Sequence, residues 1–234
     1  MADAIVHETL LRSGFDALSF DMQHGVLDLR SLEAGIALCA LAGVPAIVRM
    51  PIEDRANAAR MLDFGVSAVV MPMIEGAEDA RAFVDAVKYP PVGRRSFGPT
   101  RAAALHGYDG MADYVAEARR ETLAFAMIET ASAVAALDEI LAIDGLDGVF
   151  VGPSDLSIAL SGTGRLDPHG AEAQQAIRDV AGAVERAGKI GAIYAGDAEE
   201  AKRYRSWGYR LVCVGSDMGI LKAGAVALVS AVRQ

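Results

Sequence analysis

Short apolar segments alternate with longer stretches of helical periodicity along the whole chain. Seven apolar segments, rich in Val, Ile, Ala and Phe, are predicted to be strands: 16–21, 46–50, 68–73, 123–129, 148–152, 190–195 and 210–215. Helices are predicted over 3–14 and near 31–42, 54–64, 76–87, 111–120, 131–142, 171–187, 198–207 and 219–232. Strands that are apolar on both faces and separated by helices predict a parallel sheet covered by helices on both sides.

Polar residues follow at least four of the predicted strands, and their placement favours one architecture. They are Asp21 and His24, Arg49, Glu129 and Asp155. In an open doubly wound sheet only the strands beside the switch point would bring such residues together, whereas a closed barrel brings all of them to one mouth. We therefore predict a single (β/α)₈ TIM barrel over residues 1–234.

The predicted barrel is one strand short. A (β/α)₈ domain has eight strands and about 250 residues, but seven strands are predicted here and the helix over 3–14 begins almost at residue 1. Either the first strand lies upstream of the sequence, or the barrel closes in a different way. The sequence leaves both alternatives open.

Composition and charge narrow the class of protein. A chain of 234 residues that is 53% hydrophobic can bury one large core without a partner domain. The net charge is −9, which repels nucleic-acid phosphates and anionic lipid, so neither nucleic acid nor a membrane surface is an expected partner. An anionic metabolite is still compatible with this charge, because a few arginines or a metal ion can reverse the local potential.

The cysteines and the N-terminus predict a cytoplasmic protein. Cys39 and Cys213 each lie in an apolar segment, where cysteine usually behaves as a small hydrophobic residue. The first residues include acids and a histidine, unlike a secretory signal, and no uninterrupted apolar run reaches the roughly 18 residues of a membrane span.

Two carboxylates follow consecutive predicted strands. Glu129 and Asp155 could together bind a hard divalent ion and leave positions for water and substrate, as in Mg²⁺ or Mn²⁺ sites. The alternative is that each only begins or caps the next helix. The Gly152, Pro153 and Ser154 turn before Asp155 also offers backbone N–H groups to a carboxylate or phosphate.

His24 and Arg49 are candidates for acid–base and electrostatic roles. Asp21 lies three residues before His24, so its carboxylate could accept a ring N–H and raise the basicity of the other nitrogen. The alternative is a loop histidine beside a structural aspartate. Arg49 could pair with an acid or hold an anionic oxygen of a substrate and stabilise an enolate.

The longest predicted loop, 89–103, contains Arg94, Arg95 and Arg101. Long loops in compact domains are usually functional or disordered. One interpretation is a lid that carries cations toward an acidic substrate, and the other is a solvated or subunit-contacting loop.

Six segments, in this order, resemble the HpcH/HpaI aldolase family of metal-dependent class II pyruvate aldolases. They are GFDALSFDMQHG (14–25), VRMP (48–51), LDFGVSAVVMPMIEGAEDA (62–80), YPPVGRRSFGPTRAA (89–103), the run 128–157 and GSDMGIL (215–221). The resemblance implies a hexamer of barrels that exchange their last helix, about 219–234, between neighbouring subunits.

The resemblance also implies a reaction on 2-oxo acids. Glu129 and Asp155 would hold a divalent metal (Mg²⁺ or Mn²⁺, with Co²⁺ a further candidate) that chelates pyruvate or hydroxypyruvate and promotes loss of a proton from C3. His24, oriented by Asp21, would act as base and acid directly or through a water on the metal, while Arg49 steadies the enolate oxygen. The enolate adds to an aldehyde, or a 4-hydroxy-2-oxo acid is cleaved in reverse.

Substrate contacts follow from the same resemblance, with two departures. Gln23 and the backbone of Gly152, Pro153 and Ser154 are placed at the substrate, but many relatives carry Glu where Gln23 stands and Gln where Met127 stands. These departures permit one alternative, a non-catalytic barrel that binds a 2-oxo acid. A second alternative, from the same broad superfamily, is a citramalyl- or malyl-CoA-type lyase, for which the loop arginines are the only candidate CoA ligands.

Overall fold

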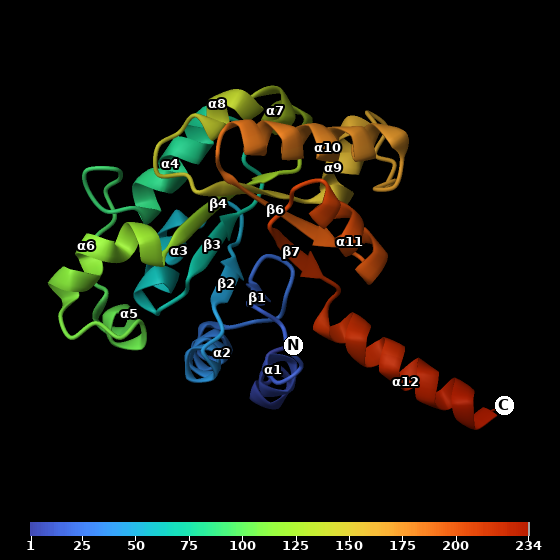
Figure 1. Cartoon of the computed structure of the whole chain (residues 1–234), viewed down its shortest axis with the longest axis horizontal. Helices are drawn as coiled ribbons and strands as arrows, with labels where there is room; N and C mark the ends of the chain where they lie inside the picture. The colour runs from blue at the N-terminus through green and yellow to red at the C-terminus, as the bar shows by residue number, and fades with distance from the viewer. Residues whose placement is uncertain (234) are drawn as a thin grey trace.

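The computed structural model describes residues 1–233, and its centre is a sheet of seven parallel strands in the order β1 to β7 (Figure 1). Every neighbouring pair is parallel, as predicted for β-α units. The strands are β1 (Leu18–Asp21), β2 (Ala46–Arg49), β3 (Ala68–Met71), β4 (Leu123–Ile128), β5 (Gly148–Val151), β6 (Ile190–Ala195) and β7 (Leu211–Val214). Each lies within a predicted strand segment.

The helices surround this sheet. They are α1 (Ala4–Leu11), α2 (Leu29–Ala42), α3 (Arg55–Asp63), α4 (Ala77–Val87), α5 (Thr100–Leu105), α6 (Met111–Glu121), α7 (Ala131–Ala135), α8 (Leu137–Leu141), α9 (Pro153–Leu160), α10 (Ala171–Arg186), α11 (Ala198–Ser206) and α12 (Asp217–Arg233). The predicted helix near 131–142 is two short helices that meet at Ala136. The short helix α5 was not predicted, and the helix that Asp155 was expected to begin in the alternative interpretation is α9.

The sheet curves into a nearly closed barrel, which confirms the TIM-barrel prediction with seven strands. β1 and β7 are its two edges, and no ladder joins them among residues 1–233. The Cys213 thiol of β7 nevertheless lies against the Ser19 hydroxyl of β1. The first helix, α1, packs on α2.

Alternation along the strands separates two apolar layers. One face of the strands forms the barrel interior, a cluster of Ile47, Ala68, Val70, Phe125, Met127, Phe150 and Ala192. The other face belongs to the larger cluster between the strands and the helices, which includes Val48, Val69 and Ile193. Because side chains alternate with a period of two, every second residue after the interior set points to the barrel axis.

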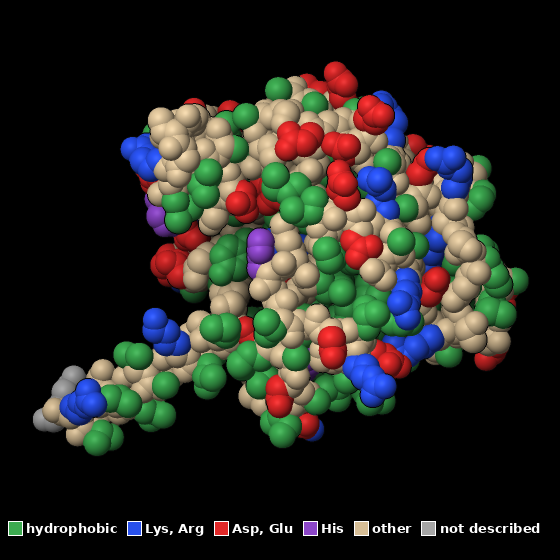
Figure 2. Space-filling view, turned by 180° about the vertical axis from the view of Figure 1, so that it is seen from behind, with side chains coloured by type: hydrophobic (Ala, Val, Ile, Leu, Met, Phe, Trp, Pro, Cys, Tyr) green, Lys and Arg blue, Asp and Glu red, His purple; other side chains and the backbone are tan. Residues whose placement is uncertain are grey.

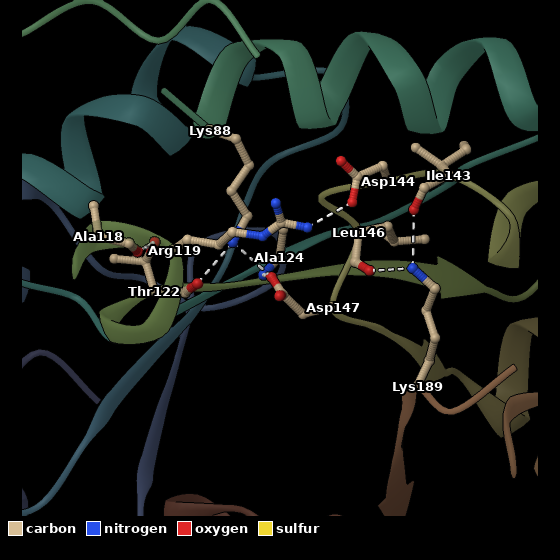
Figure 3. Close-up of polar contacts among 10 residues, drawn as sticks. All are labelled: Lys88, Ala118, Arg119, Thr122, Ala124, Ile143, Asp144, Leu146, Asp147 and Lys189. Atoms are coloured by element: carbon tan, nitrogen blue, oxygen red, sulfur yellow. Dashed lines mark hydrogen bonds and ion pairs between the residues drawn. The ribbon is translucent and has the colours of Figure 1, made fainter. Parts of the chain in front are cut away.

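The buried Lys88 and the half-buried Asp147 and Lys189 hold together the end of the barrel where the strands begin (Figure 3). Lys88 Nζ donates to the Thr122 carbonyl at 2.7 Å and to Asp147 Oδ2 at 2.6 Å. Asp147 Oδ2 also accepts from the Ala124 N–H at 2.7 Å. Lys189 Nζ donates to two carbonyls of the preceding connection, those of Ile143 and Leu146. These bonds connect the starts of β4, β5 and β6.

The loop 89–103 also lies at this end, because it follows α4 and runs into α5, in the connection that leads to β4. Its arginines are engaged away from the opposite mouth: Arg95 pairs with Asp63 at 2.6 Å, Arg94 pairs with Asp85, and Arg101 donates to the Phe64 carbonyl at 2.6 Å. The interpretation of this loop as a cationic lid over the mouth is therefore wrong.

The last helix, α12, has no buried residue and projects from the body of the molecule (Figures 1 and 2). Its exposed large hydrophobic residues are Met218, Ile220, Leu221, Val226, Leu228, Val229 and Val232. In the part of the chain that the structure describes, no helix has both the length and the apolar character needed to cross a membrane.

Candidate active site

The carboxyl ends of the strands place acidic and basic side chains at one mouth. Asp21 and Arg49 are the last residues of β1 and β2 and lie side by side in register. Both have the inward parity of the interior cluster, as does Glu129, which directly follows β4. The mouth is thus lined by groups that the fold collects from separate strands.

Asp21 and Arg49 form a two-point ion pair. Asp21 Oδ1 accepts from Arg49 Nε at 2.9 Å, and Oδ2 accepts from Nη2 at 2.5 Å. Burial alone raises the pKa of Asp21, but the bonds from Arg49 outweigh it and the pKa lies below its ordinary value. Burial alone lowers the pKa of Arg49, but Asp21, helped by the charges of Glu129 and Asp155, raises it. Both groups are therefore held in their charged forms.

Asp21 does not orient the His24 ring as predicted. Its Oδ1 accepts the backbone N–H groups of Gln23 and His24, at 3.0 and 3.3 Å, so it fixes the turn that follows β1. The His24 side chain is exposed, and no hydrogen bond from its ring is present among residues 1–233. The Oε1 atom of Gln23 is buried without a partner in the same region.

Glu129 is a buried carboxylate, with 2% of the residue exposed. It does not cap the next helix, because Thr130 is the N-cap of α7. Its Oε1 accepts the backbone N–H of Met73 at 2.7 Å. Burial raises the pKa of Glu129, the charge of Asp155 adds to this, and the Met73 bond and Arg49 oppose it.

Met73, which donates its backbone N–H to Glu129, has an unusual backbone conformation. It is a non-glycine residue with a φ of +52°. Such left-handed conformations cost energy for most residues, and they persist where the surroundings enforce them. The turn after β3 therefore supplies a fixed donor to the Glu129 carboxylate.

Gly152 leaves room beside the other carboxylate oxygen. A Cβ at this position would lie 2.5 Å from Glu129 Oε2 and 3.1 Å from the Met127 side chain. Gly152 is also the N-cap of α9, and Asp155 is exposed in the first turn of this helix. Its negative charge lies at the helix N-terminus, where it is favourable, and it raises the pKa of both Glu129 and Arg49.

The two carboxylates suit a hard divalent cation. Oxygen ligands are those that Mg²⁺ and Mn²⁺ prefer, and a cation between two like charges would relieve their repulsion. Among the described residues no cluster of three or more His, Cys, Asp or Glu side chains could hold a metal. Glu129 and Asp155 would thus leave coordination positions for other ligands.

One mouth residue was not singled out from the sequence. Tyr194 follows Ala192 of the interior cluster by two residues in β6, so it points into the barrel near the end of its strand. The alternation in IGAIYA (190–195) indicates that Tyr194 and Ala192 share one face of the strand. The structure was needed to show that this face is the barrel interior.

The chain is similar to known proteins over nearly its whole length. The family model of the HpcH/HpaI aldolase/citrate lyase family matches residues 1–223. A hydroxypyruvate/pyruvate aldolase of Roseovarius nubinhibens is 38% identical over 94% of this chain and 84% of its own length. A 4-hydroxy-2-oxo-heptane-1,7-dioate aldolase of Klebsiella pneumoniae is 35% identical over 94% and 82%.

A solved structure shows the same fold. The crystal structure of a family protein from Burkholderia cenocepacia is 31% identical, with a TM-score of 0.89, and the match covers 100% of this chain and 92% of that one.

Proposed function

The chain belongs to the HpcH/HpaI aldolase/citrate lyase family, and on this premise we propose that its barrel mouth catalyses a class II aldol reaction. The reaction joins the enolate of a 2-oxo acid, pyruvate or hydroxypyruvate, to an aldehyde, or cleaves the resulting 4-hydroxy-2-oxo acid. The enzyme is a carbon–carbon lyase, as are the relatives named aldolases.

The observation that carries this proposal is the pair of Glu129 and Asp155. Glu129 is a buried carboxylate whose pKa is raised by burial, and the negative charge of Asp155 raises it further. This arrangement is costly unless a cation or proton compensates it. A divalent ion held by Glu129 and Asp155 would supply Lewis-acid polarisation of the keto acid.

The protein's own groups have separate roles. Arg49, kept charged by Asp21, donates hydrogen bonds to the developing enolate oxygen. The exposed His24 imidazole exchanges the proton at C3 of the donor, and its backbone is fixed by Asp21. Gln23 and the backbone from Gly152 to Ser154 bind the carboxylate of the 2-oxo acid.

Exchange of the methyl protons of pyruvate with D₂O tests the proposal, because it reports enolate formation without an acceptor. We expect exchange with Mg²⁺, Mn²⁺ or Co²⁺, loss in EDTA, and loss in Glu129→Gln and His24→Ala. Glu139→Gln, on α8, is the matched control and should retain exchange. A metal-loaded protein that binds pyruvate without exchange would instead be a non-catalytic barrel.

No observation favours a citramalyl- or malyl-CoA-type lyase. Arg94, Arg95 and Arg101 were the only candidates for a CoA pyrophosphate, and they are engaged at the other end of the barrel. The acyl-CoA reaction should therefore be absent while pyruvate exchange proceeds.

We also propose that α12 is exchanged between subunits of a cytoplasmic hexamer. The helix has no buried residue and presents seven large exposed hydrophobic side chains, and exposed apolar surface of this kind usually marks an interface. Free thiols at Cys39 and Cys213 support a reducing compartment.

A further inference from the structure

Tyr194 of β6 points into the barrel near the end where the strands finish. Ile193 and Ala195 belong to the layer between strands and helices, whereas Ala192 belongs to the interior cluster. Alternation therefore directs the Tyr194 side chain to the barrel axis. It is 39% exposed, whereas the inward residue before it, Ala192, is fully buried, so the ring lies at the open mouth.

The register places this ring beside the proposed reaction site. Val151 of β5 pairs with Ile193, so the next residues along, Gly152 and Tyr194, are neighbours at the strand ends. Gly152 has no side chain to separate Tyr194 from Glu129. The Oε2 atom of Glu129 lies 2.5 Å from the position that a Cβ of residue 152 would take. On the other side, Tyr194 pairs with Cys213 of β7. The tyrosine thus forms the wall across Gly152 from the Glu129 carboxylate.

The phenol hydroxyl is available to a ligand. Tyr209, Tyr108 and Tyr204 use their hydroxyl groups in hydrogen bonds within the protein. No such bond is formed by Tyr194 within the described chain, and its exposure leaves the hydroxyl open to the mouth. A tyrosine with an apolar ring fixed in a wall and a free hydroxyl suits recognition of a polar substituent.

The charges at the barrel mouth determine which kind of substrate substituent can lie beside Tyr194. Of the inward-facing strand residues that the structure describes, Arg49 is the sole cation, and Asp21 engages it at two points. A negatively charged substituent beside Tyr194 would find no positively charged side chain on β5 or β6 to pair with, whereas a neutral hydroxyl can both donate to and accept from the phenol.

We propose that Tyr194 is the residue that recognises the acceptor aldehyde, and that its hydroxyl selects neutral aldehydes with a hydroxyl group next to the carbonyl. This inference rests on the proposed aldolase function and adds the class of the acceptor. The donor 2-oxo acid is held on the Glu129 and Arg49 side, and the acceptor lies between the donor and Tyr194.

Tyr194→Phe tests the inference, because it removes one oxygen and keeps the ring. The acceptors to compare, with pyruvate as donor, are glycolaldehyde and propanal, which differ by a hydroxyl in place of a methyl group. We expect the unmodified enzyme to favour glycolaldehyde and Tyr194→Phe to lose about three- to tenfold in kcat/KM for it, the usual worth of one neutral hydrogen bond. The value for propanal and the D₂O exchange of pyruvate should stay unchanged.

Tyr108→Phe is the matched control. The Tyr108 hydroxyl donates to Glu121 at the end of α6, away from the mouth. Equal losses for both acceptors, loss of exchange in Tyr194→Phe, or a preference of the unmodified enzyme for the carboxylate-bearing succinic semialdehyde would overturn the inference. An unmodified enzyme without exchange would overturn the proposed function and the inference with it. Normal exchange with an unaltered acceptor ratio would overturn the inference alone.

Discussion

Arg49 donates to both carboxylate oxygens of Asp21, and this pair joins the ends of β1 and β2 at the mouth. The same carboxylate accepts the backbone N–H groups of Gln23 and His24. Asp21 therefore connects the charge of Arg49 to the path of the loop that carries His24. A change at Asp21 should affect both stability and the position of the proposed base.

Asp21→Asn should lower the free energy of unfolding by about 1–2 kcal/mol at pH 7, less than the loss of a fully buried pair because the side chains are partly exposed. The pKa of Asp21 is depressed in the folded state, so its stabilisation is present above the ordinary value of 3.8 and is lost as the pH falls through the lower, folded-state pKa. Urea unfolding of both proteins at pH 7 and below pH 3.8 checks this. A difference that stays constant across this range would contradict the assignment.

Gly152→Ala should abolish most of the pyruvate exchange while the protein still folds. The new Cβ would lie 2.5 Å from Glu129 Oε2 and would displace the carboxylate. Affinity for Mn²⁺, measured by calorimetry, should fall together with the exchange rate. Gly182→Ala in α10 is the control, because its Cβ would meet only the flexible end of Arg186, at 3.3 Å. An active Gly152→Ala protein would show that Glu129 does not need its observed position.

The Met73 N–H should matter more than the Met73 side chain. Met73→Pro removes the donor to Glu129 and, because proline cannot adopt a positive φ, also displaces the turn. It should raise the pKa of that carboxyl further, weaken Mn²⁺ binding and slow exchange by about tenfold or more. Met73→Gly keeps the N–H, accepts the φ of +52° without strain and should retain binding. Equal behaviour of the two variants would contradict a role for the backbone.

Lys88→Met should destabilise the protein without changing the chemistry. Lys88 is 4% exposed, and its removal leaves Asp147 without its cation, which typically costs about 3 kcal/mol or more for a buried pair. Chemical denaturation measures this cost, and pyruvate exchange below the transition should equal that of the unmodified enzyme. Lys202→Met, whose partner Glu199 is also exposed, should change stability by at most about 0.5 kcal/mol.

Negative charges introduced on α12 should dissociate the proposed hexamer into smaller species. Leu221→Glu with Leu228→Glu places two carboxylates among side chains that are 62% and 72% exposed in the isolated chain. Light scattering after chromatography should show a smaller mass than for the unmodified protein. Lys222→Glu is a control for charge alone. An unchanged mass would exclude α12 from the subunit interface.

The alternation of apolar and polar segments determined the order of strands and helices. Each of the seven strands is an apolar run between turn residues, so the local pattern was sufficient. The bounds of α9 were not predicted, because this helix is short and begins at the polar Pro153–Asp155 turn, a pattern that is equally typical of a loop. The closure of the sheet depended on contacts between distant segments, which no local pattern reports.

The sequence also determined which residues stand at the strand ends, among them Asp21, Arg49 and Glu129. Only the tertiary structure decided which of them meet. Asp21 is three residues from His24, yet it bonds the side chain of Arg49, because parallel pairing of β1 with β2 brings that guanidinium alongside. Tyr194 became a wall of the mouth in the same way, since strand register places residues from distant parts of the chain side by side, and spacing along one segment does not contain that information.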